Sequence, residues 1–154
     1  MYQHTLFEKL NEDEYNQFLQ VFEEKKIKKG ETIIKDGESG ETAFLLIEGQ
    51  VSVIKETIYG EDYIVTTIDA GGDEFFGEIN LIDKGVRTST ITAVTDVVIL
   101  EISNKNLFQF MDKNPVIGYK IMSYLAKSFS KHLRKADDDL ITLFNALVEV
   151  VEND

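Results

Sequence analysis

The pattern of apolar and polar residues predicts a short helix near the start of the chain. Within residues 6–22, Asn11 can serve as an N-cap, and Glu14, three residues later, can complete a capping box. The apolar residues that follow share one helical face, namely Tyr15, Phe18, Leu19 and Phe22. A short amphipathic helix is therefore expected over this segment.

Between residues 24 and 102 the apolar residues instead alternate with polar ones or form short blocks. These blocks read TIIK, FLLIEGQVSVI, YIVTTI, TSTITAV and VVILEI, and glycines lie between them. Many short strands at nearly even spacing are typical of a β-sandwich or a jelly roll. We therefore expect a mainly β fold in this part of the chain.

A helical period returns after Pro115, the only proline. Apolar residues then recur at alternating steps of four and three, at Met122, Ala126, Phe129, Leu133, Ala136, Leu140, Leu143, Leu147 and Val150. We expect one unbroken helix, although the carboxylates of residues 137–139 could instead cap a second helix after a joint. The chain is thus expected to divide into residues 1–114, with the N-terminal helix and the strands, and a C-terminal helical region, residues 115–154.

Composition limits the classes of function. With 154 residues, of which 43% are hydrophobic, the chain can form one domain with a sizeable core plus an appendage. It has no cysteine, so packing rather than disulfides must stabilise it. Its net charge of −12 repels nucleic acid and anionic membranes, and we expect it to bind neither on its own. No segment approaches the roughly 18 apolar residues of a membrane span or resembles a signal peptide, so a cytoplasmic location is expected.

The sequence offers no catalytic constellation. Its two histidines, His4 and His132, lie far apart, one at the terminus and one in the last helix, which argues against a histidine-based metal centre inside a β-barrel. Ser89, Ser103 and Ser128 have no histidine nearby in sequence to activate them. We therefore expect a protein that is not an enzyme and that holds neither a metal nor a cofactor.

One stretch, FGEINLIDKGVRTSTITA at residues 76–93, combines groups that could bind a ligand. Gly77 lets the backbone approach a ligand closely, and Arg87 can supply two parallel N–H donors to phosphate oxygens. Thr88 and Ser89 add hydroxyl donors, while the carboxylate of Glu78 would repel phosphate and is suited to accept from a sugar hydroxyl. These residues fit a ribose fused to a phosphate, although the residues alone favour the simpler interpretation, a turn that carries a surface ion pair.

The same stretch closely resembles the phosphate-binding cassette of the cyclic nucleotide-binding domain family, to which catabolite activator protein-like proteins and protein kinase A regulatory subunits belong. That cassette reads roughly F-G-E-L-A-L-x-x-x-x-x-R-x-A-T-V-x-A, and this sequence keeps Phe76, Gly77, Glu78, Leu81, Arg87 and Ala93 at that spacing. Upstream, KKGETIIKDGESGETAFLLIEGQVSV resembles the family's first strands. The resemblance implies an eight-stranded antiparallel β-jelly roll with an N-terminal helix, a short helix within the cassette and a long C-terminal helical region.

By this resemblance, Glu78 would accept a hydrogen bond from the ribose 2′-hydroxyl, and Arg87 would bind the cyclic phosphate. The other contacts would be backbone N–H groups of Gly77, Ile79 and Asn80, and hydroxyls of Thr88 and Ser89 that line the phosphate or the base. The residue that covers the base stays open among His132, Arg134 and Lys135.

Three departures from the family pattern are visible. The segment GGDEFFGE holds one residue more than the usual G-D-x-F-G-E, which predicts a bulge in the strand that enters the cassette. Asn80 replaces a small alanine and could either crowd the pocket or add a donor. Ser89, directly after Thr88, replaces the usual alanine of the pattern, which makes the phosphate end more polar.

The sequence therefore predicts a sensor that binds cAMP, with cGMP a close second, and couples binding to its C-terminal helix. The heptad pattern predicts a homodimer through that helix. The printed sequence leaves no room for the helix-turn-helix of bacterial transcription factors of this family, so a stand-alone domain that acts on an unidentified effector protein is expected. Two alternatives stay open: the same fold bound to another nucleotide, such as a cyclic dinucleotide, and a ligand-free coiled-coil adaptor.

Overall fold

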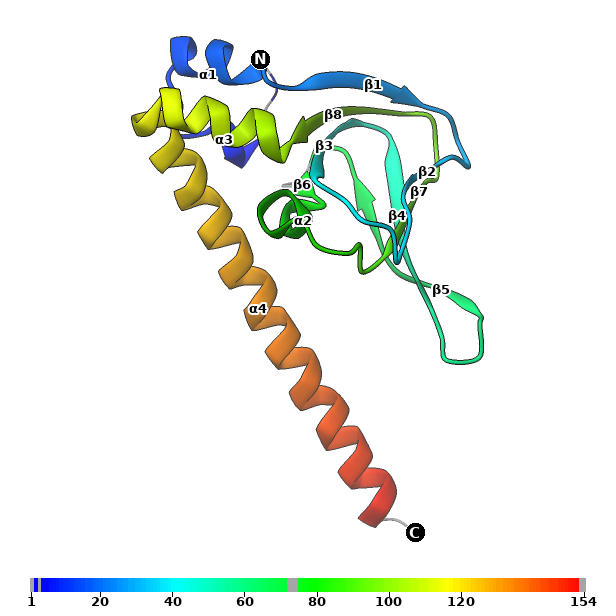
Figure 1. Cartoon of the computed structure of the whole chain (residues 1–154). Helices are drawn as coiled ribbons and strands as arrows, with labels where there is room; N and C mark the ends of the chain where they lie inside the picture. The colour runs from blue at the N-terminus through cyan, green and yellow to red at the C-terminus, as the bar shows by residue number, and fades with distance from the viewer. Residues whose placement is uncertain (1, 3, 72–74, 153–154) are drawn as a thin grey trace.

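A computed structural model describes residues 2, 4–71 and 75–152 of the chain. Eight strands in these residues form two four-stranded sheets, in the orders β1-β8-β3-β6 and β2-β7-β4-β5 (Figure 1). All neighbouring strands pair in the antiparallel sense. The predicted antiparallel jelly roll is therefore confirmed. The bulge predicted at the entry to the cassette falls on residues 72–74, which lie outside the described part of the chain.

The bounds of the elements follow the sequence blocks closely. The strands are β1 (Glu23–Ile27), β2 (Thr32–Ile34), β3 (Thr42–Glu48), β4 (Gln50–Glu56), β5 (Asp62–Asp69), β6 (Phe75–Phe76), β7 (Thr90–Ala93) and β8 (Val97–Ser103). The helices are the 3₁₀ turn η1 (Thr5–Phe7) and the α-helices α1 (Glu12–Leu19), α2 (Glu78–Asp83), α3 (Asn104–Lys113) and α4 (Pro115–Glu152).

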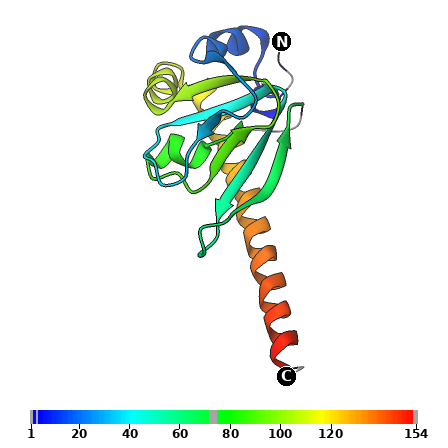
Figure 2. The ribbon, with the colours of Figure 1, turned by 90° about the vertical axis from the view of Figure 1, so that its right-hand side faces the viewer.

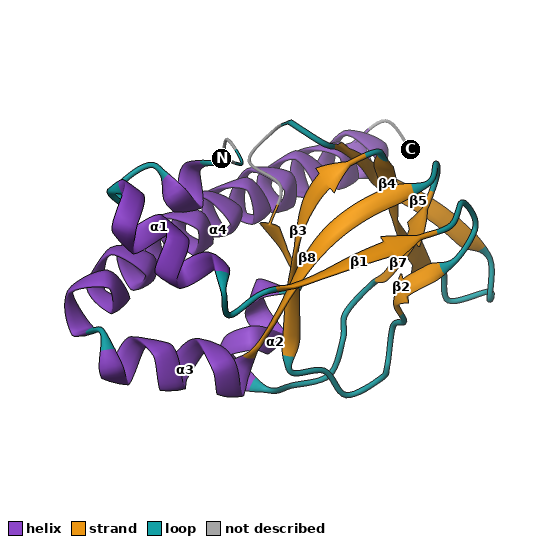
Figure 3. Ribbon diagram, turned by 90° about the horizontal axis from the view of Figure 1, so that it is seen from above, coloured by secondary structure: helices purple, strands orange, loops and turns teal. Residues whose placement is uncertain are grey.

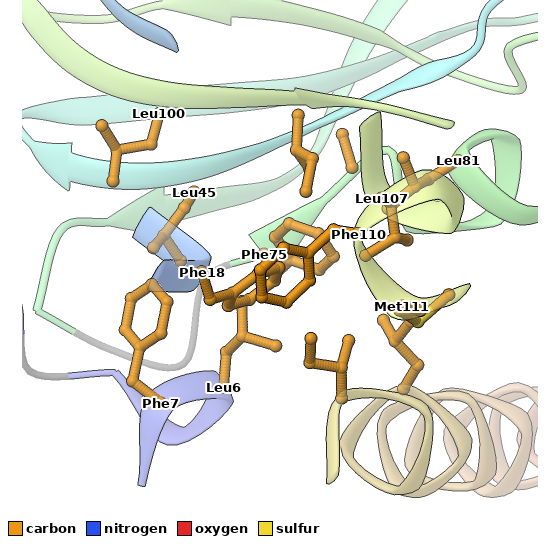
Figure 4. Packing of buried hydrophobic residues seen from close by; sticks show 14 of the residues in the cluster. Leu6, Phe7, Phe18, Leu45, Phe75, Leu81, Leu100, Leu107, Phe110 and Met111 are labelled. Atoms are coloured by element: carbon orange, nitrogen blue, oxygen red, sulfur yellow. The ribbon is translucent and has the colours of Figure 1, made fainter. Parts of the chain in front are cut away.

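Strand β3 is buried on both faces, which explains its continuous apolar run. Its residues Phe44 and Leu46 pack in a cluster with residues of both sheets, so that cluster is the core between the sheets. Ala43 and Leu45 point the other way, into a second cluster with the helices (Figure 4). Because successive side chains of a strand alternate between faces, one strand joins the two cores. Figure 3 shows α1, α3 and the start of α4 gathered at one side of the strands.

Helix α1 begins as the sequence predicts but ends earlier. The Asn11 side chain accepts a hydrogen bond from the backbone N–H of Glu14, and the Glu14 side chain accepts one from the N–H of Asn11, which completes the capping box. The helix ends at Leu19, so Phe22 is not on its face as expected. Phe22 still packs beside Phe18, with ring centroids 5.1 Å apart, because the chain turns back towards the same cluster.

Helix α4 is a single unbroken helix, as predicted, and its two halves differ in environment. Its buried residues, Ile117, Gly118, Ile121 and Leu125, all lie in the first three turns. Gly118 allows close contact with α3, since a Cβ at this position would lie 3.0 Å from the Cβ of Met111. The rest of the helix extends away from the barrel (Figures 1 and 2). None of the helices in the described residues is long and apolar enough to cross a membrane.

A buried hydrogen bond links α3 to the short helix α2. The Asn104 side chain, at the start of α3, donates from Nδ2 to the backbone carbonyl of Leu81 at 2.7 Å. Asn104 is buried, and so is Leu81. The bond therefore satisfies a carbonyl that water cannot reach, and it ties the position of α2 to the helices that lead into α4.

We predict that Asn104→Ala lowers the free energy of unfolding by about 1–3 kcal/mol, because the Leu81 carbonyl loses its donor while it stays buried. Urea denaturation followed by circular dichroism measures the change. The matched control is Gln109→Ala, an exposed position on the same helix, which should change stability by less than about 0.5 kcal/mol. Equal effects of the two substitutions would show that the buried bond contributes nothing.

Candidate functional site

The turn between β6 and α2 depends on Gly77. This residue has φ 77° and ψ 11°, the left-handed region that residues with a side chain adopt only with strain. A Cβ at Gly77 would also lie 2.9 Å from Nη1 of Arg87 and 3.0 Å from the carbonyl oxygen of Thr42. Glycine therefore lets the chain turn directly against the arginine and begin α2 at Glu78.

Arg87 lies in the wall of the barrel with only 7% of its surface exposed. Its Nη2 donates to the hydroxyl of Thr42 at 2.9 Å, and its Nη1 donates to Oδ1 of Asn80 at 3.3 Å. The guanidinium also lies over the ring of Phe44, 6.0 Å from its centroid. These partners are all uncharged, and Arg87 forms no ion pair with a carboxylate in the described part of the chain. Burial lowers the pKa of Arg87, since the charged form loses hydration.

Gly40 makes room for this guanidinium. A Cβ at Gly40 would collide with the Nε and Cζ atoms of Arg87. The backbone N–H of Gly40 donates to the carbonyl of Gly85, which holds the two loops together. Any larger residue at position 40 would therefore displace the arginine side chain.

Glu78 is the second buried charged group of the site. Its Oε1 lies 3.0 Å from Nδ1 of His132, which reaches it from α4. Glu78 is 7% exposed, whereas the His132 side chain is 55% exposed. Burial raises the pKa of Glu78, and hydrogen bonding from its own backbone and the contact with His132 oppose that rise only in part.

These groups line one cavity of about 390 Å³. All seven residues that the sequence suggests for a ligand line it: Gly77, Glu78, Ile79, Asn80, Arg87, Thr88 and Ser89. Asn80 and Arg87 are buried, Ser89 is half-buried, and Ile79 and Thr88 are exposed at the opening. Opposite the polar groups the wall is apolar, formed by Ile34, Val53, Ile68 and Ile91 among others. The cavity can thus hold a molecule with an anionic end and an apolar, flat or bulky end.

The structure adds residues that the sequence did not suggest as site residues. Gly40 and Thr42 surround the guanidinium, but they lie some 45 residues upstream of Arg87, outside the cassette at residues 76–93. Among the three candidates for covering the base, His132 lines the cavity, whereas Arg134 and Lys135 do not. A single sequence carries no signal that would have separated these three.

Asn80 adds a donor to the site rather than blocking it. Its Oδ1 accepts from Arg87, which fixes the orientation of the amide, and its Nδ2 is buried with no hydrogen-bond partner among the described residues. A buried donor without a partner is costly unless a ligand or water satisfies it. No group of three or more histidine, aspartate or glutamate residues in the described part of the chain could hold a metal ion.

Comparison with known proteins shows which family contains this chain. Residues 24–114, more than half of the chain, match the sequence profile of the cyclic nucleotide-binding domain. The chain belongs to the cyclic nucleotide-binding domain family. The matched range runs from the second residue of β1 to just past the end of α3, and it includes every residue that lines the cavity except His132.

Curated relatives of this cyclic nucleotide-binding domain include the cyclic AMP receptor protein of Thermus thermophilus, 26% identical over 88% of this chain and 60% of the relative. The cAMP-activated global transcriptional regulator CRP of Pasteurella multocida is 33% identical over 70% of this chain and 51% of its own length. The chain thus spans about half to three fifths of the length of these relatives.

Solved structures agree with this assignment. The catabolite activator protein of Thermus thermophilus superposes with a TM-score of 0.79 at 26% identity, over 90% of this chain and 62% of that one. The regulatory domain of Toxoplasma gondii protein kinase A with cAMP gives a TM-score of 0.60 at 27% identity, over 68% and 39% of the two chains.

The buried carboxyl of Glu78 predicts a dependence of stability on pH. Because its pKa is raised on folding, the folded protein binds this proton more tightly than the unfolded chain, so stability falls as pH rises above the ordinary value of 4.5 and through the raised pKa. Glu78→Gln removes that loss. We therefore expect the variant to melt at a higher temperature than the wild type at pH 7, with a difference that shrinks towards pH 4.5.

Thermal melts monitored by circular dichroism between pH 4.5 and 8 measure the difference. Glu56→Gln, at an exposed carboxylate on β4, is the control and should follow the wild type at every pH. A Glu78→Gln variant that is less stable than the wild type at pH 7 would contradict the prediction.

Proposed function

We propose that this chain is a non-enzymatic sensor of a cyclic nucleotide, with cAMP as the first ligand and cGMP as a close second. The observation that carries the proposal is the Arg87 guanidinium, buried at the wall of a cavity with uncharged partners. Keeping a cation buried without an opposite charge is unfavourable, and an anionic ligand would compensate it. A carboxylate in the same cavity, Glu78, matches a ligand that also presents hydroxyl groups.

Each predicted site residue has a place in this proposal. Arg87 would bind the cyclic phosphate together with backbone N–H groups of the turn at Gly77, Ile79 and Asn80. Glu78 would accept the ribose 2′-hydroxyl. Thr88 and Ser89 lie where hydroxyls can meet the phosphate or the base, and the apolar wall would contact the base.

Coupling to the C-terminal helix would pass through His132. In the structure, Nδ1 of His132 lies 3.0 Å from one carboxylate oxygen of Glu78. A ribose hydroxyl would compete with His132 for this carboxylate, so ligand binding and the position of α4 would be linked. A contact of this kind typically couples two sites by 1–3 kcal/mol.

The outer half of α4 would act as the output. Its heptad residues Leu133, Leu140, Leu143, Leu147 and Val150 are each more than 60% exposed, and such an apolar seam favours a partner helix. We propose a homodimer through this seam, with residues 1–114 as the binding unit and residues 115–154 as the regulated helix. The readout would lie with a separate, unidentified effector protein in the cytoplasm. Because the chain has a net charge of −12, we expect it to bind neither nucleic acid nor membranes.

Removal of the anchor tests the binding site. Arg87→Ala should weaken cAMP binding by about 2–5 kcal/mol, because the ligand charge would stay buried without its partner. The control is Lys84→Ala, whose exposed ammonium lies at the end of α2 and should lose little affinity. Isothermal titration calorimetry with cAMP, cGMP and cyclic di-GMP measures all three proteins. Equal affinity of the wild type and Arg87→Ala would refute the site.

A second variant tests the same anchor without removing its charge. Gly40→Ala should also weaken cAMP binding, because its methyl group would push the guanidinium from its position. Gly85→Ala is the control and should affect binding less, because a Cβ at Gly85 has more room.

The ligand panel tests the order of the nucleotides. A preference for cGMP over cAMP of more than about tenfold, or 1.4 kcal/mol, would reverse the proposed order. If only cyclic di-GMP bound tightly, the proposed ligand would be wrong, but the proposed binding site would still hold.

The homodimer has its own test. Leu140→Asp places a charge in the seam and should convert a dimer into a monomer in sedimentation velocity experiments, with and without ligand. Asn145→Asp adds the same charge to the same helix away from the heptad positions and should leave the dimer intact. A wild type that sediments as a monomer in both conditions would defeat the coiled-coil proposal but would leave ligand binding untouched.

A further inference from the structure

A second concave site lies between the N-terminal segment and α4. It has a volume of about 210 Å³, and residues of the first nine positions face residues of α4 across it. Its lining includes Leu6 and Tyr124, which give it apolar surface, and three exposed lysines, Lys9, Lys127 and Lys131. His132 also lines it and thus lies between this cleft and the nucleotide cavity.

The charge of this cleft is opposite to that of the whole chain. Four lysines line it, Lys120 being the fourth, in a protein with a net charge of −12. Lys120 is neutralised by Glu14, with Nζ 2.6 Å from a carboxylate oxygen. Lys9, Lys127 and Lys131 form no ion pair with any described residue, and Glu8 is the one carboxylate among the lining residues.

The basic residues of α4 are segregated along the helix. Residues 115–136 contain five basic residues and no acidic one, whereas residues 137–154 contain six acidic residues and no basic one. Lys127 and Lys131 lie one turn apart, where like charges destabilise a helix. Exposed helix faces normally carry acidic residues among the basic ones. Residues 115–136 contain none, so no carboxylate on this part of the helix can pair with Lys127 or Lys131.

The lining fits a small anion better than an extended partner. Ammonium groups are compact donors that bind phosphate oxygens as point charges, and the hydroxyl of Ser128 offers a further donor at the same wall. Because opposite charges elsewhere on the chain are screened over about 8 Å at physiological salt, local lysines control the potential inside a cleft of this size.

We propose that this cleft is a second ligand site, which binds a small, multiply charged phosphate anion beside the nucleotide cavity. The site is separate from Arg87 and Glu78, and it goes beyond the proposed sensing of a cyclic nucleotide. Since His132 lines both cavities, the anion would sit next to the residue that holds Glu78.

Inorganic pyrophosphate is the probe, titrated by calorimetry into the full chain carrying Arg87→Ala so that the nucleotide cavity cannot bind it through its anchor. We expect saturable binding that weakens about tenfold or more when Lys127→Gln and Lys131→Gln are combined. The control pair, Lys26→Gln with Lys29→Gln, removes the same charge from exposed positions at β1 and the turn after it. It should change the affinity by less than about threefold.

Three results would overturn the proposal. The first is the absence of saturable binding at millimolar pyrophosphate, and the second is an equal loss of affinity in both double-lysine variants. The third is a dimer that pyrophosphate dissociates in sedimentation experiments, which would assign the lysines to a contact between protomers. Amide chemical shifts of the wild type give a reading without any substitution. Shifts centred on residues 127–131 support the site, and shifts confined to residues 77–89 oppose it. The outcome is independent of whether cAMP binds.

Discussion

The burial of one guanidinium organises the binding side of this molecule. Arg87 lies inside the wall of the barrel, and its neighbours are small or neutral so that its charge stays available. Gly40 and Gly77 leave out the side chains that would overlap it, and Thr42 and Asn80 each accept a hydrogen bond from one of its two terminal nitrogens. A buried charge without a counterion is unfavourable for the stability of the fold. The proposed anionic ligand would offset this cost, so its binding would also raise the folding stability.

Glu78 and Asn80 are two further polar residues of the cavity that are buried at a cost in stability. One is a carboxyl whose pKa is raised by burial, and the other has an amide nitrogen with no partner among the described residues. The only side chain from the C-terminal helix that lines the cavity in the described structure is His132. Among the described residues, the helix α4 therefore reaches the buried carboxyl of Glu78 through one side chain, that of His132.

Much of the fold and the central part of the site could be predicted from the sequence because they are local. The residues from Phe76 to Ala93 lie in one continuous stretch, so their spacing can be compared with a family motif directly. The unbroken α4 follows from a heptad pattern that no glycine or proline interrupts after Gly118. The surroundings of Arg87 could not be predicted in this way. Gly40 and Thr42 approach it because residues 37–40 pair with residues 85–87, which are far away in sequence. The contact of His132 with Glu78 depends on the angle at which α4 leaves α3. The end of α1 at Leu19 could not be predicted either, because it also depends on tertiary packing. Phe22 packs against Phe18 although it lies outside the helix, so the apolar pattern alone does not mark where the helix ends.

The straightness of α4 has a mechanical consequence. The buried residues of the helix all lie in its first turns, and the helix rises about 1.5 Å per residue, so His132 lies about 25 Å from its start and Glu152 about 55 Å. If the helix rotates as a rigid rod about its junction with α3, its far end moves roughly twice as far as the histidine does. The helix can thus act as a lever, and its contact with Glu78 at the cavity lies near the middle of its length. A displacement at His132 too small to disturb the barrel would become a larger one at the exposed apolar end.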